Sequence, residues 1–153
     1  MKTNVIGVML AIAAVTIVLP TISPLARSQN SSELAGTSWK LVKLQAGDET
    51  TSVPDDGSKY TITFGRNGRV TARVDCNRGG STWKSNRPNE LQFGSWSMTR
   101  AKCPPGSLHD RIVREGAAVR SYAIKNGHLF LSGMAAGGYY ELEPLTTPGR
   151  RRP

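Results

Sequence analysis

The residues of this chain that can do chemistry include two cysteines. Cys76 and Cys103 are the only cysteines in the sequence, and the N-terminal export signal described below would carry both into an oxidising compartment. Two cysteines in such a compartment are expected to pair. The sequence therefore predicts a Cys76–Cys103 disulfide. In the chain-entropy model it would stabilise the fold by about 3–4 kcal/mol, which is a large share of the net stability of a small domain.

The chain also has two histidines, His109 and His128. A catalytic nucleophile needs a base to activate it and a third group to orient that base, and neither histidine lies in a motif of that kind. A metal site of both cysteines and both histidines would have enough ligands, but it lacks the CxxC or HxxxH spacing of local chelation. We predict no catalytic residue, no metal site and no cofactor, and we interpret both histidines as ordinary, partly exposed residues.

Acidic and glycine pairs give no stronger indication of chemistry. Asp48-Glu49 and Asp55-Asp56 are typical of turns. Glu141 and Glu143 lie on one face of an expected strand, where two acids could act together, but an exposed strand face is our interpretation. No glycine-rich phosphate loop follows a strand, and Gly79-Gly80 is interpreted as a bend.

Polar and basic residues are concentrated near the two cysteines. If the disulfide forms, it gathers these residues at one end of the fold, where a basic patch bearing a tryptophan could bind an anionic glycan or lipid headgroup. The residues of this expected patch are Asn77, Arg78, Trp83, Arg100 and Lys102. The alternative is that Trp39, Trp83 and Trp96 fill the core and the charges flank the disulfide.

The N-terminal segment predicts export. Lys2 precedes an uncharged apolar run from Val5 to Leu19, and Pro20 follows. This pattern is typical of a signal peptide over residues 1–28, with cleavage after Ser28 or after Ala26. An uncleaved anchor is the alternative, although the run is shorter than the about 20 apolar residues that span a bilayer. No cysteine lies near the cleavage site, so we expect no lipid anchor and a periplasmic or secreted protein.

The expected mature chain is small and basic. Its 125 residues suit one domain with one core, and its 18 basic and 11 acidic residues give a net charge of +7. Such an excess attracts anionic partners, which for an exported protein would be lipid headgroups, lipopolysaccharide, teichoic acids or acidic glycans. Nucleic acid would need an intracellular address. A basic surface that serves only solubility is the alternative.

Most of the chain alternates between apolar and polar residues, as half-buried strands do. Residues 60–64 and 70–76 do so on either side of the turn 65–68, and together they predict a hairpin. Asn126-Gly127 joins a second hairpin and is a strong signal for a two-residue turn. Further strands are expected over 37–44, 80–84, 90–97, 121–125, 128–132 and 138–143.

One short helix is expected after Pro104-Pro105-Gly106. Ser107 and Asp110 form a capping-box-like start, and Leu108, Ile112 and Val119 would share one face. Gly116 weakens this helix. Residues 29–35 and 146–153 are predicted to be disordered. About eight short antiparallel strands and one helix fit a small β barrel that hides its edges.

Five sequence blocks, taken in order, resemble the META domain family, which includes the HslJ-type heat-shock proteins of bacterial envelopes. The resemblance covers about residues 34–143, and Asp75 departs from it by standing where the family usually has a small residue. The blocks are Gly36-Thr-Ser-Trp-Lys-Leu, residues 60–70, Cys76-Asn-Arg-Gly-Gly, Met98-Thr-Arg-Ala-Lys-Cys-Pro104 and Leu129-Phe-Leu.

The resemblance implies a lipocalin-like antiparallel β barrel over residues 36–145. It also implies a location outside the cytoplasm, a role in envelope stress or antibiotic tolerance, and no established catalytic residue. We therefore expect a non-enzymatic protein that binds an envelope component. An inhibitor of an extracytoplasmic protease or other hydrolase is the alternative, although a basic lysozyme would be repelled by this charge. An enzyme is the third hypothesis.

Overall fold

The structure is a computed structural model of the whole chain, and it describes residues 33–133 and 137–145. The expected signal peptide (1–28) and basic tail (146–153) lie outside the described residues. The described chain forms ten strands, one α-helix and one 3₁₀ turn. They are β1 (Thr37–Gln45), β2 (Thr51–Ser52), η1 (Gly57–Lys59), β3 (Tyr60–Phe64), β4 (Arg69–Val74), β5 (Asn77–Lys84), β6 (Gln92–Phe93), β7 (Ser97–Met98), α1 (His109–Gly116), β8 (Ser121–Lys125), β9 (His128–Ser132) and β10 (Tyr139–Pro144).

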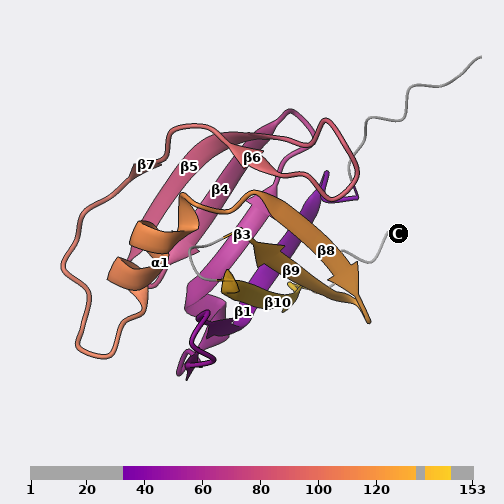
Figure 1. The fold of residues 1–153 in the computed structure, drawn as a ribbon. Coiled ribbons are helices and arrows are strands. Elements are labelled where there is room, and N and C mark those ends of the chain that lie inside the picture. Colours follow the sequence, from indigo (N-terminus) through magenta and orange to yellow (C-terminus); the bar gives the residue numbers. More distant parts are fainter. Residues whose placement is uncertain (1–32, 134–136, 146–153) are drawn as a thin grey trace, which may run out of the picture.

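The strands form one curled antiparallel sheet in the order β6-β5-β4-β3-β1-β10-β9-β8, with β2 paired to β1 and β7 paired to β5 (Figure 1). The two ends of this order meet. The Leu91 N–H donates to the Arg120 carbonyl at 2.9 Å, and the Tyr122 N–H donates to the Asn89 carbonyl at 2.9 Å. The eight-stranded path is therefore a nearly closed barrel, which confirms the predicted fold class and satisfies edge groups that would otherwise be unpaired.

The barrel interior follows the predicted alternation. In β3, Tyr60, Ile62 and Phe64 are buried, while Thr61 and Thr63 are not. Each fully buried large apolar side chain contributes roughly 1.5–3 kcal/mol. The same core also contains side chains from β1, β4, β5, β8, β9 and β10, among them Trp39, Leu41, Leu44, Val70, Trp83, Tyr122, Leu129, Leu131, Tyr140 and Leu142.

Two tight turns join neighbouring strands. Asn126 and Gly127 have φ angles of 52° and 79° between the paired residues Lys125 and His128, as the sequence predicts. Asp75 occupies the second turn with a φ of 56°, so its departure from the family pattern does not prevent a tight turn there. Aspartate tolerates this left-handed conformation better than most residues.

Several predicted strand boundaries are wrong. The strand predicted over 70–76 ends at Val74, because Asp75 and Cys76 form the turn to β5. The strand predicted over 90–97 is divided into β6 and β7. Gly79, interpreted as a bend, lies inside β5, where a Cβ atom would come within 2.5 Å of the Ser97 carbonyl oxygen. The glycine therefore lets β7 pack against β5.

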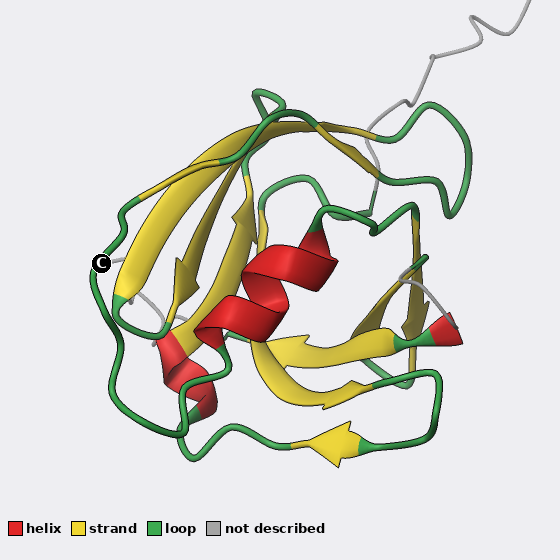
Figure 2. Ribbon diagram, turned by 60° about the vertical axis from the view of Figure 1, so that its left-hand side comes forward, coloured by secondary structure: helices red, strands yellow, loops and turns green. Residues whose placement is uncertain are grey.

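The helix is shorter than predicted and begins differently. It starts at His109, and the Ser107 hydroxyl accepts the His109 N–H at 3.1 Å instead of capping a later turn. The predicted capping box is therefore absent, and Val119 lies beyond the end of the helix, although it is buried. Figure 2 shows α1 lying across one side of the curved sheet.

The ordered domain begins before residue 36. Leu34 is fully buried in the core, its carbonyl accepts the Thr37 N–H at 3.1 Å, and the Gly36 N–H donates to the Phe64 carbonyl at 2.7 Å. The prediction of disorder for residues 29–35 is therefore wrong for Leu34 and Ala35. Residues 29–32 lie outside the described residues.

Candidate functional site

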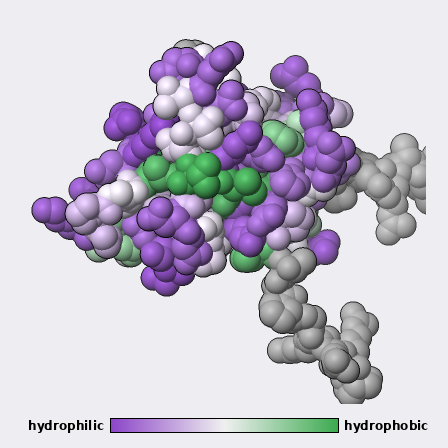
Figure 3. Space-filling model, turned by 90° about the horizontal axis from the view of Figure 1, so that it is seen from below, coloured by the Kyte–Doolittle hydropathy of each residue, from purple (hydrophilic) through white to green (hydrophobic). Residues whose placement is uncertain are grey.

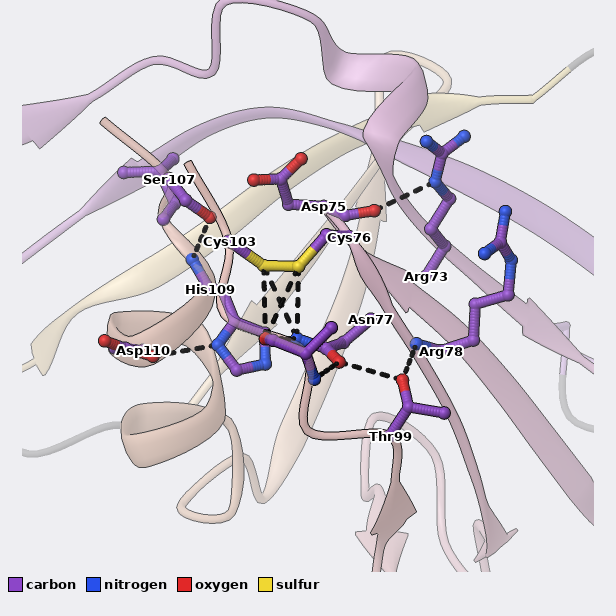
Figure 4. The surroundings of a disulfide bond; sticks show 12 residues. Arg73, Asp75, Cys76, Asn77, Arg78, Thr99, Cys103, Ser107, His109 and Asp110 are labelled. Atoms are coloured by element: carbon purple, nitrogen blue, oxygen red, sulfur yellow. Dashed lines mark hydrogen bonds and ion pairs between the residues drawn. A yellow bond between two sulfur atoms is a disulfide. The ribbon is translucent and has the colours of Figure 1, made fainter. Parts of the chain in front are cut away.

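The disulfide joins the β4–β5 turn to the loop between β7 and α1. Cys76 and Cys103 are bonded, with their Cα atoms 5.5 Å apart and a sequence separation of 27. This confirms the predicted pairing. The bridge links the sheet to residues 99–108, the segment that leads into the helix (Figure 4). We name residues 99–108 the bridged loop.

Asn77 holds the bridged loop from inside. Its side chain is fully buried, and its Oδ1 atom accepts the Thr99 hydroxyl at 2.8 Å and the Ala101 N–H at 2.7 Å. Its Nδ2 atom donates to the Ala101 carbonyl at 2.9 Å. Figure 4 shows the amide lying between the disulfide and Thr99. The Asn77 side chain thus supplies the hydrogen bonds that a neighbouring strand would otherwise give to this extended loop backbone.

The predicted anionic-ligand patch is only partly formed. Arg78, Arg100 and Lys102 are exposed and flank the disulfide, but the Asn77 amide is used internally. Trp83 lies six residues further along β5, about 20 Å away at strand spacing. It is buried, donates to the Gly65 carbonyl at 3.1 Å and meets the Phe64 ring edge-on at 5.3 Å. Asn77 and Trp83 therefore cannot contact a ligand at this patch.

The three tryptophans differ in their surroundings. Trp39 and Trp83 are 6 % and 9 % exposed and belong to the core, as one reading of the sequence expects. Trp96 does not fill the core. It is half-buried and packs edge-on against Phe93, with ring centroids 5.4 Å apart. Trp96 instead borders an open cavity.

This cavity lies between α1, the β6–β7 segment and the inner face of the barrel. Its volume is about 290 Å³, and it is open to solvent on one side. Its wall is mainly apolar, although Thr61, Arg73 and Ser95 are also among the residues that line it. The side chains that define its shape are Leu41, Ile62, Ala72, Phe93, Trp96, Met98, Ile112, Val119, Leu131, Tyr140 and Leu142. A concave, mainly apolar space with few polar groups is the usual form of a small-molecule site.

Tyr140 supplies a buried polar atom in this wall. The residue is 5 % exposed, and its hydroxyl has no hydrogen-bond partner among the described residues. A Cβ atom on Gly116, which also lines the cavity, would lie 4.0 Å from the hydroxyl. Burial raises the pKa of Tyr140 well above its usual value, and the nearby Glu115 carboxylate adds to this while Arg111 and Arg114 oppose it. The hydroxyl therefore stays protonated and can donate.

Polar contacts hold α1 over the cavity. The Leu108 N–H donates to the Tyr60 hydroxyl at 3.0 Å. One turn further on, Arg111 donates to the Ser52 hydroxyl at 2.8 Å and pairs with Glu115 at 3.2 Å. These contacts fix the helix orientation, so Ile112 of α1 faces the cavity. The disulfide acts on the same helix through the bridged loop.

Tyr60 and Arg73 also line this cavity, whereas the two histidines and their acidic partners do not. His128 pairs with Glu141 at 2.8 Å, and the same carboxylate pairs with Lys43 at 3.3 Å. The hydrogen bond from Lys43 to Glu141 raises the pKa of Lys43. His109 pairs through its ring with the exposed Asp110 at 2.8 Å. These are paired groups of the outer surface, and neither histidine lines the cavity.

The described part of the chain, residues 33–133 and 137–145, contains neither a metal-binding cluster nor a membrane-spanning helix. No group of three or more histidine, cysteine, aspartate or glutamate side chains is arranged to hold a metal ion there. No helix in that part is both long and apolar enough to cross a membrane.

Together these features define a small, nearly closed β barrel that carries a disulfide and an apolar cavity beneath its single described helix. The META domain model matches residues 32–143, and the chain belongs to this family. Among curated proteins no similar sequence is found.

Two solved structures have the same fold. A protein from Burkholderia xenovorans, determined by NMR, aligns with a TM-score of 0.63 at 18 % identity, over 74 % of this chain and 85 % of its own. A crystal structure of a DUF4847 family protein from Bacteroides vulgatus aligns with a TM-score of 0.53 at 12 % identity, over 72 % of this chain and 94 % of its own. At these identities the likeness concerns the fold alone.

Sequence reasoning missed the cavity and its buried hydroxyl. The alternation of β10 indicates that Tyr140 and Leu142 face inward, but it does not show what surrounds them. The signal that was available was a tyrosine at an inward position, because a buried tyrosine hydroxyl needs a partner. That the partner is missing depends on where α1 lies, which the alternation does not determine.

Proposed function

We propose that this META domain protein is an exported, non-enzymatic binding protein of the cell envelope that holds a mainly apolar ligand in the cavity beneath α1. The observation that carries the proposal is the cavity itself. It is open, about 290 Å³ in volume and apolar in its lining. The apolar side chains that line an open cavity are unfavourably exposed to water, and a bound apolar ligand would cover them.

Export is supported by the disulfide and by the N-terminal sequence. Disulfides persist in the periplasm and outside the cell and are rare in the cytosol, and Cys76 and Cys103 are bonded. The run from Val5 to Leu19 is of signal-peptide length. We propose that residues 1–28 are removed on export and that the mature protein has no lipid anchor.

The contacts of the residues that could take part in catalysis support a function without catalysis. The Ser107 hydroxyl accepts a backbone N–H, the His109 ring pairs with Asp110, and His128 pairs with Glu141. A nucleophile and its base must contact each other, and the Ser107 hydroxyl contacts the backbone N–H of His109 and not its imidazole ring. We propose that the protein acts by binding, in the envelope stress response or in antibiotic tolerance.

The exposed cations beside the disulfide support contact with anionic envelope components. Arg78, Arg100 and Lys102 lie at one end of the barrel, and the whole chain carries a formal charge of +9. Long-range attraction of this kind concentrates a protein at anionic lipid or glycan surfaces and weakens as salt rises. We propose that this surface brings the cavity to its ligand.

Extraction of the protein from envelopes tests the proposal. The protein is purified at low salt, and the molecules that leave with it are identified by native mass spectrometry. Ala72 lines the cavity, so Ala72→Leu would fill part of the space. Thr71→Leu is the matched control, because Thr71 is the exposed neighbour of Ala72 on β4. A bound small molecule that is present in wild type and Thr71→Leu but absent from Ala72→Leu supports the proposal. A wild-type protein that carries no small molecule opposes it.

A second candidate function is inhibition of an extracytoplasmic protease, and the bridged loop favours it. Arg100, Ala101 and Lys102 are exposed, while the Asn77 side chain fixes both backbone groups of Ala101 and the disulfide holds Cys103. A rigid, exposed segment pays little ordering entropy on binding. A basic side chain on such a segment fits the acidic specificity pocket of a trypsin-like protease.

Inhibition assays separate this candidate from the first. Wild-type protein at micromolar concentration is tested against trypsin-like proteases, with Arg100→Ala, Lys102→Ala and the distant surface variant Arg87→Ala. Inhibition that is lost in Arg100→Ala or Lys102→Ala but kept in Arg87→Ala supports an inhibitor. Unimpaired proteolysis with the wild-type protein removes this candidate.

A further inference from the structure

We infer that the cavity binds a medium-length acyl chain whose carboxylate or ester oxygen accepts a hydrogen bond from the Tyr140 hydroxyl. This inference rests on the proposed function, because it names the ligand class of the same cavity. Four features support it. They are the volume of the cavity, its one unpartnered hydroxyl, the sign of the charges near that hydroxyl, and the adaptable side chains near its opening.

The volume sets the size of the ligand. An engineered apolar cavity of about 150 Å³ in another protein holds one benzene molecule, and the present cavity is about 290 Å³. By that ratio it accepts roughly twelve non-hydrogen atoms. A carboxylic acid with about ten carbon atoms has this size. A chain of sixteen carbon atoms would leave several methylene groups in water.

The Tyr140 hydroxyl sets the position of the polar group. It is buried, lines the cavity and has no partner in the described part of the chain. A buried hydroxyl without a hydrogen bond is destabilising, because nothing compensates for the water it has lost. A ligand oxygen that accepts from it would remove this cost, whereas a purely hydrocarbon ligand would not. The ligand is therefore amphiphilic, with one acceptor oxygen at the end that lies beneath the last turn of α1.

Charges near that turn favour an oxygen anion or carbonyl over an amine. Arg111 and Arg114 lie on α1 within electrostatic range of Tyr140. Among these charges Glu115 acts most strongly on the Tyr140 hydroxyl, but it pairs with Arg111 at 3.2 Å and with Arg114 at 3.6 Å, so the three side chains together carry one net positive charge. Arg73 also lines the cavity, and the mature chain expected after export has 18 basic and 11 acidic residues, a net charge of +7. This arrangement attracts a carboxylate and repels an ammonium group.

The β6–β7 side of the cavity suits a flexible chain. Trp96 and Met98 are half-buried against the core, and β6 and β7 have two residues each. Methionine adapts its shape to what it contacts. Short strands hold their backbone with few ladder hydrogen bonds, so this wall can adjust to ligands of different length.

Figure 3 shows that strongly apolar residues also lie exposed in an elongated patch on one face, bordered by hydrophilic residues.

The envelope offers this chemistry in two forms, which are free fatty acids and acyl esters such as monoacyl lipids. Both carry an oxygen that can accept from Tyr140. Decanoate and 1-decanoyl glycerol are the probes for the two forms, and decylamine is the control of equal chain length and opposite charge. All are used below the concentrations at which they form micelles. Tryptophan fluorescence reports binding, because Trp96 borders the cavity.

Four proteins are titrated with each probe, and circular dichroism first establishes that each is folded. They are wild type, Tyr140→Phe, Ala72→Leu and Thr71→Leu. We expect saturable binding of decanoate, of 1-decanoyl glycerol or of both by the wild type, and the one that binds more tightly identifies the source. Tyr140→Phe should weaken the tighter probe at least about tenfold. Ala72→Leu should weaken it further, and Thr71→Leu should leave it within twofold. Hexadecanoate should bind more weakly than decanoate.

Three results would overturn the inference, and they differ in what they say of the proposed function. Binding that Ala72→Leu abolishes but Tyr140→Phe leaves unchanged, or decylamine binding as tightly as decanoate, would mean that the cavity holds ligands without selecting an acyl oxygen. The inference would then fail and the proposed function would stand. If the wild type binds none of the probes and carries no small molecule from the envelope, both fail.

Discussion

Replacement of Asn77 by alanine would remove the side chain that holds the bridged loop. Three hydrogen bonds of 2.7–2.9 Å would be lost, one to the Thr99 hydroxyl and two to the backbone of Ala101. Thr99 and Ala101 are exposed, so water can replace the partner that each loses. Each bond then counts at its net value of about 1 kcal/mol, and we expect the free energy of unfolding to fall by about 3 kcal/mol.

Urea denaturation monitored by tryptophan fluorescence measures this loss, with the disulfide intact. Asn86→Ala is the matched control, because Asn86 is exposed in the loop after β5. It should change the free energy of unfolding by no more than about 0.5 kcal/mol. In Asn77→Ala, amide exchange at Ala101 should also accelerate. A loss below about 1 kcal/mol for Asn77→Ala, or an equal loss in both variants, would refute the role assigned to Asn77.

Three further predictions concern the disulfide, the cavity and a surface ion pair. Reduction of the Cys76–Cys103 bridge should lower the free energy of unfolding by about 3–4 kcal/mol, and an unchanged urea midpoint would contradict this. Tyr140→Phe should stabilise the ligand-free protein by roughly 1 kcal/mol at neutral pH, because it removes a buried hydroxyl without a partner. The pKa of Tyr140 is raised above its unfolded value of 10.0, so the wild type should lose stability as pH rises above about 10, and Tyr140→Phe should lose less. If the free energy of unfolding fell equally in both proteins above pH 10, this prediction would be contradicted. The hydrogen bond from Lys40 lowers the pKa of Glu143. The stability that this ion pair contributes is therefore present above the unfolded pKa of 4.5 and is lost as pH falls through the lowered pKa. An NMR titration should show the pKa of Glu143 rising in Lys40→Met, and no change would show that the pair does not form in solution.

The barrel could be predicted from local patterns because its long strands alternate and its turns carry suitable residues. Residues 60–64 alternate strictly, and Asn126-Gly127 supplies both left-handed conformations of its turn. Such signals depend only on neighbours in sequence. The disulfide needed one further premise, which is the export predicted from the N-terminal segment. With that premise, two cysteines leave no choice of partner.

The short elements could not be predicted, because contacts distant in sequence create them. β2 and β7 have two residues each, too few for alternation to be detected, and β7 depends on the missing side chain of Gly79. The helix begins at His109 because the residues before it are tied to the sheet, Leu108 to Tyr60 and Cys103 to Cys76. A local capping pattern does not contain these contacts.

The sequence predicted the cations beside the disulfide but not the cavity. Arg78, Arg100 and Lys102 are exposed near the disulfide, as composition and spacing indicate. Trp83 was assigned to the same patch because it is close in sequence, but an extended strand carries it to the other end of β5. The cavity forms because α1 lies over the barrel, and no single segment of the sequence determines that arrangement.

Isotope-filtered NMR of the protein with decanoate tests the central claim most directly. If the cavity beneath α1 is the binding site, nuclear Overhauser effects should connect the methylene protons of the ligand to the methyl groups of Ile112, Val119 and Leu131, which line it. Contacts confined to the exposed side chains Val53 and Ile124, which are absent from the cavity wall, would contradict the account.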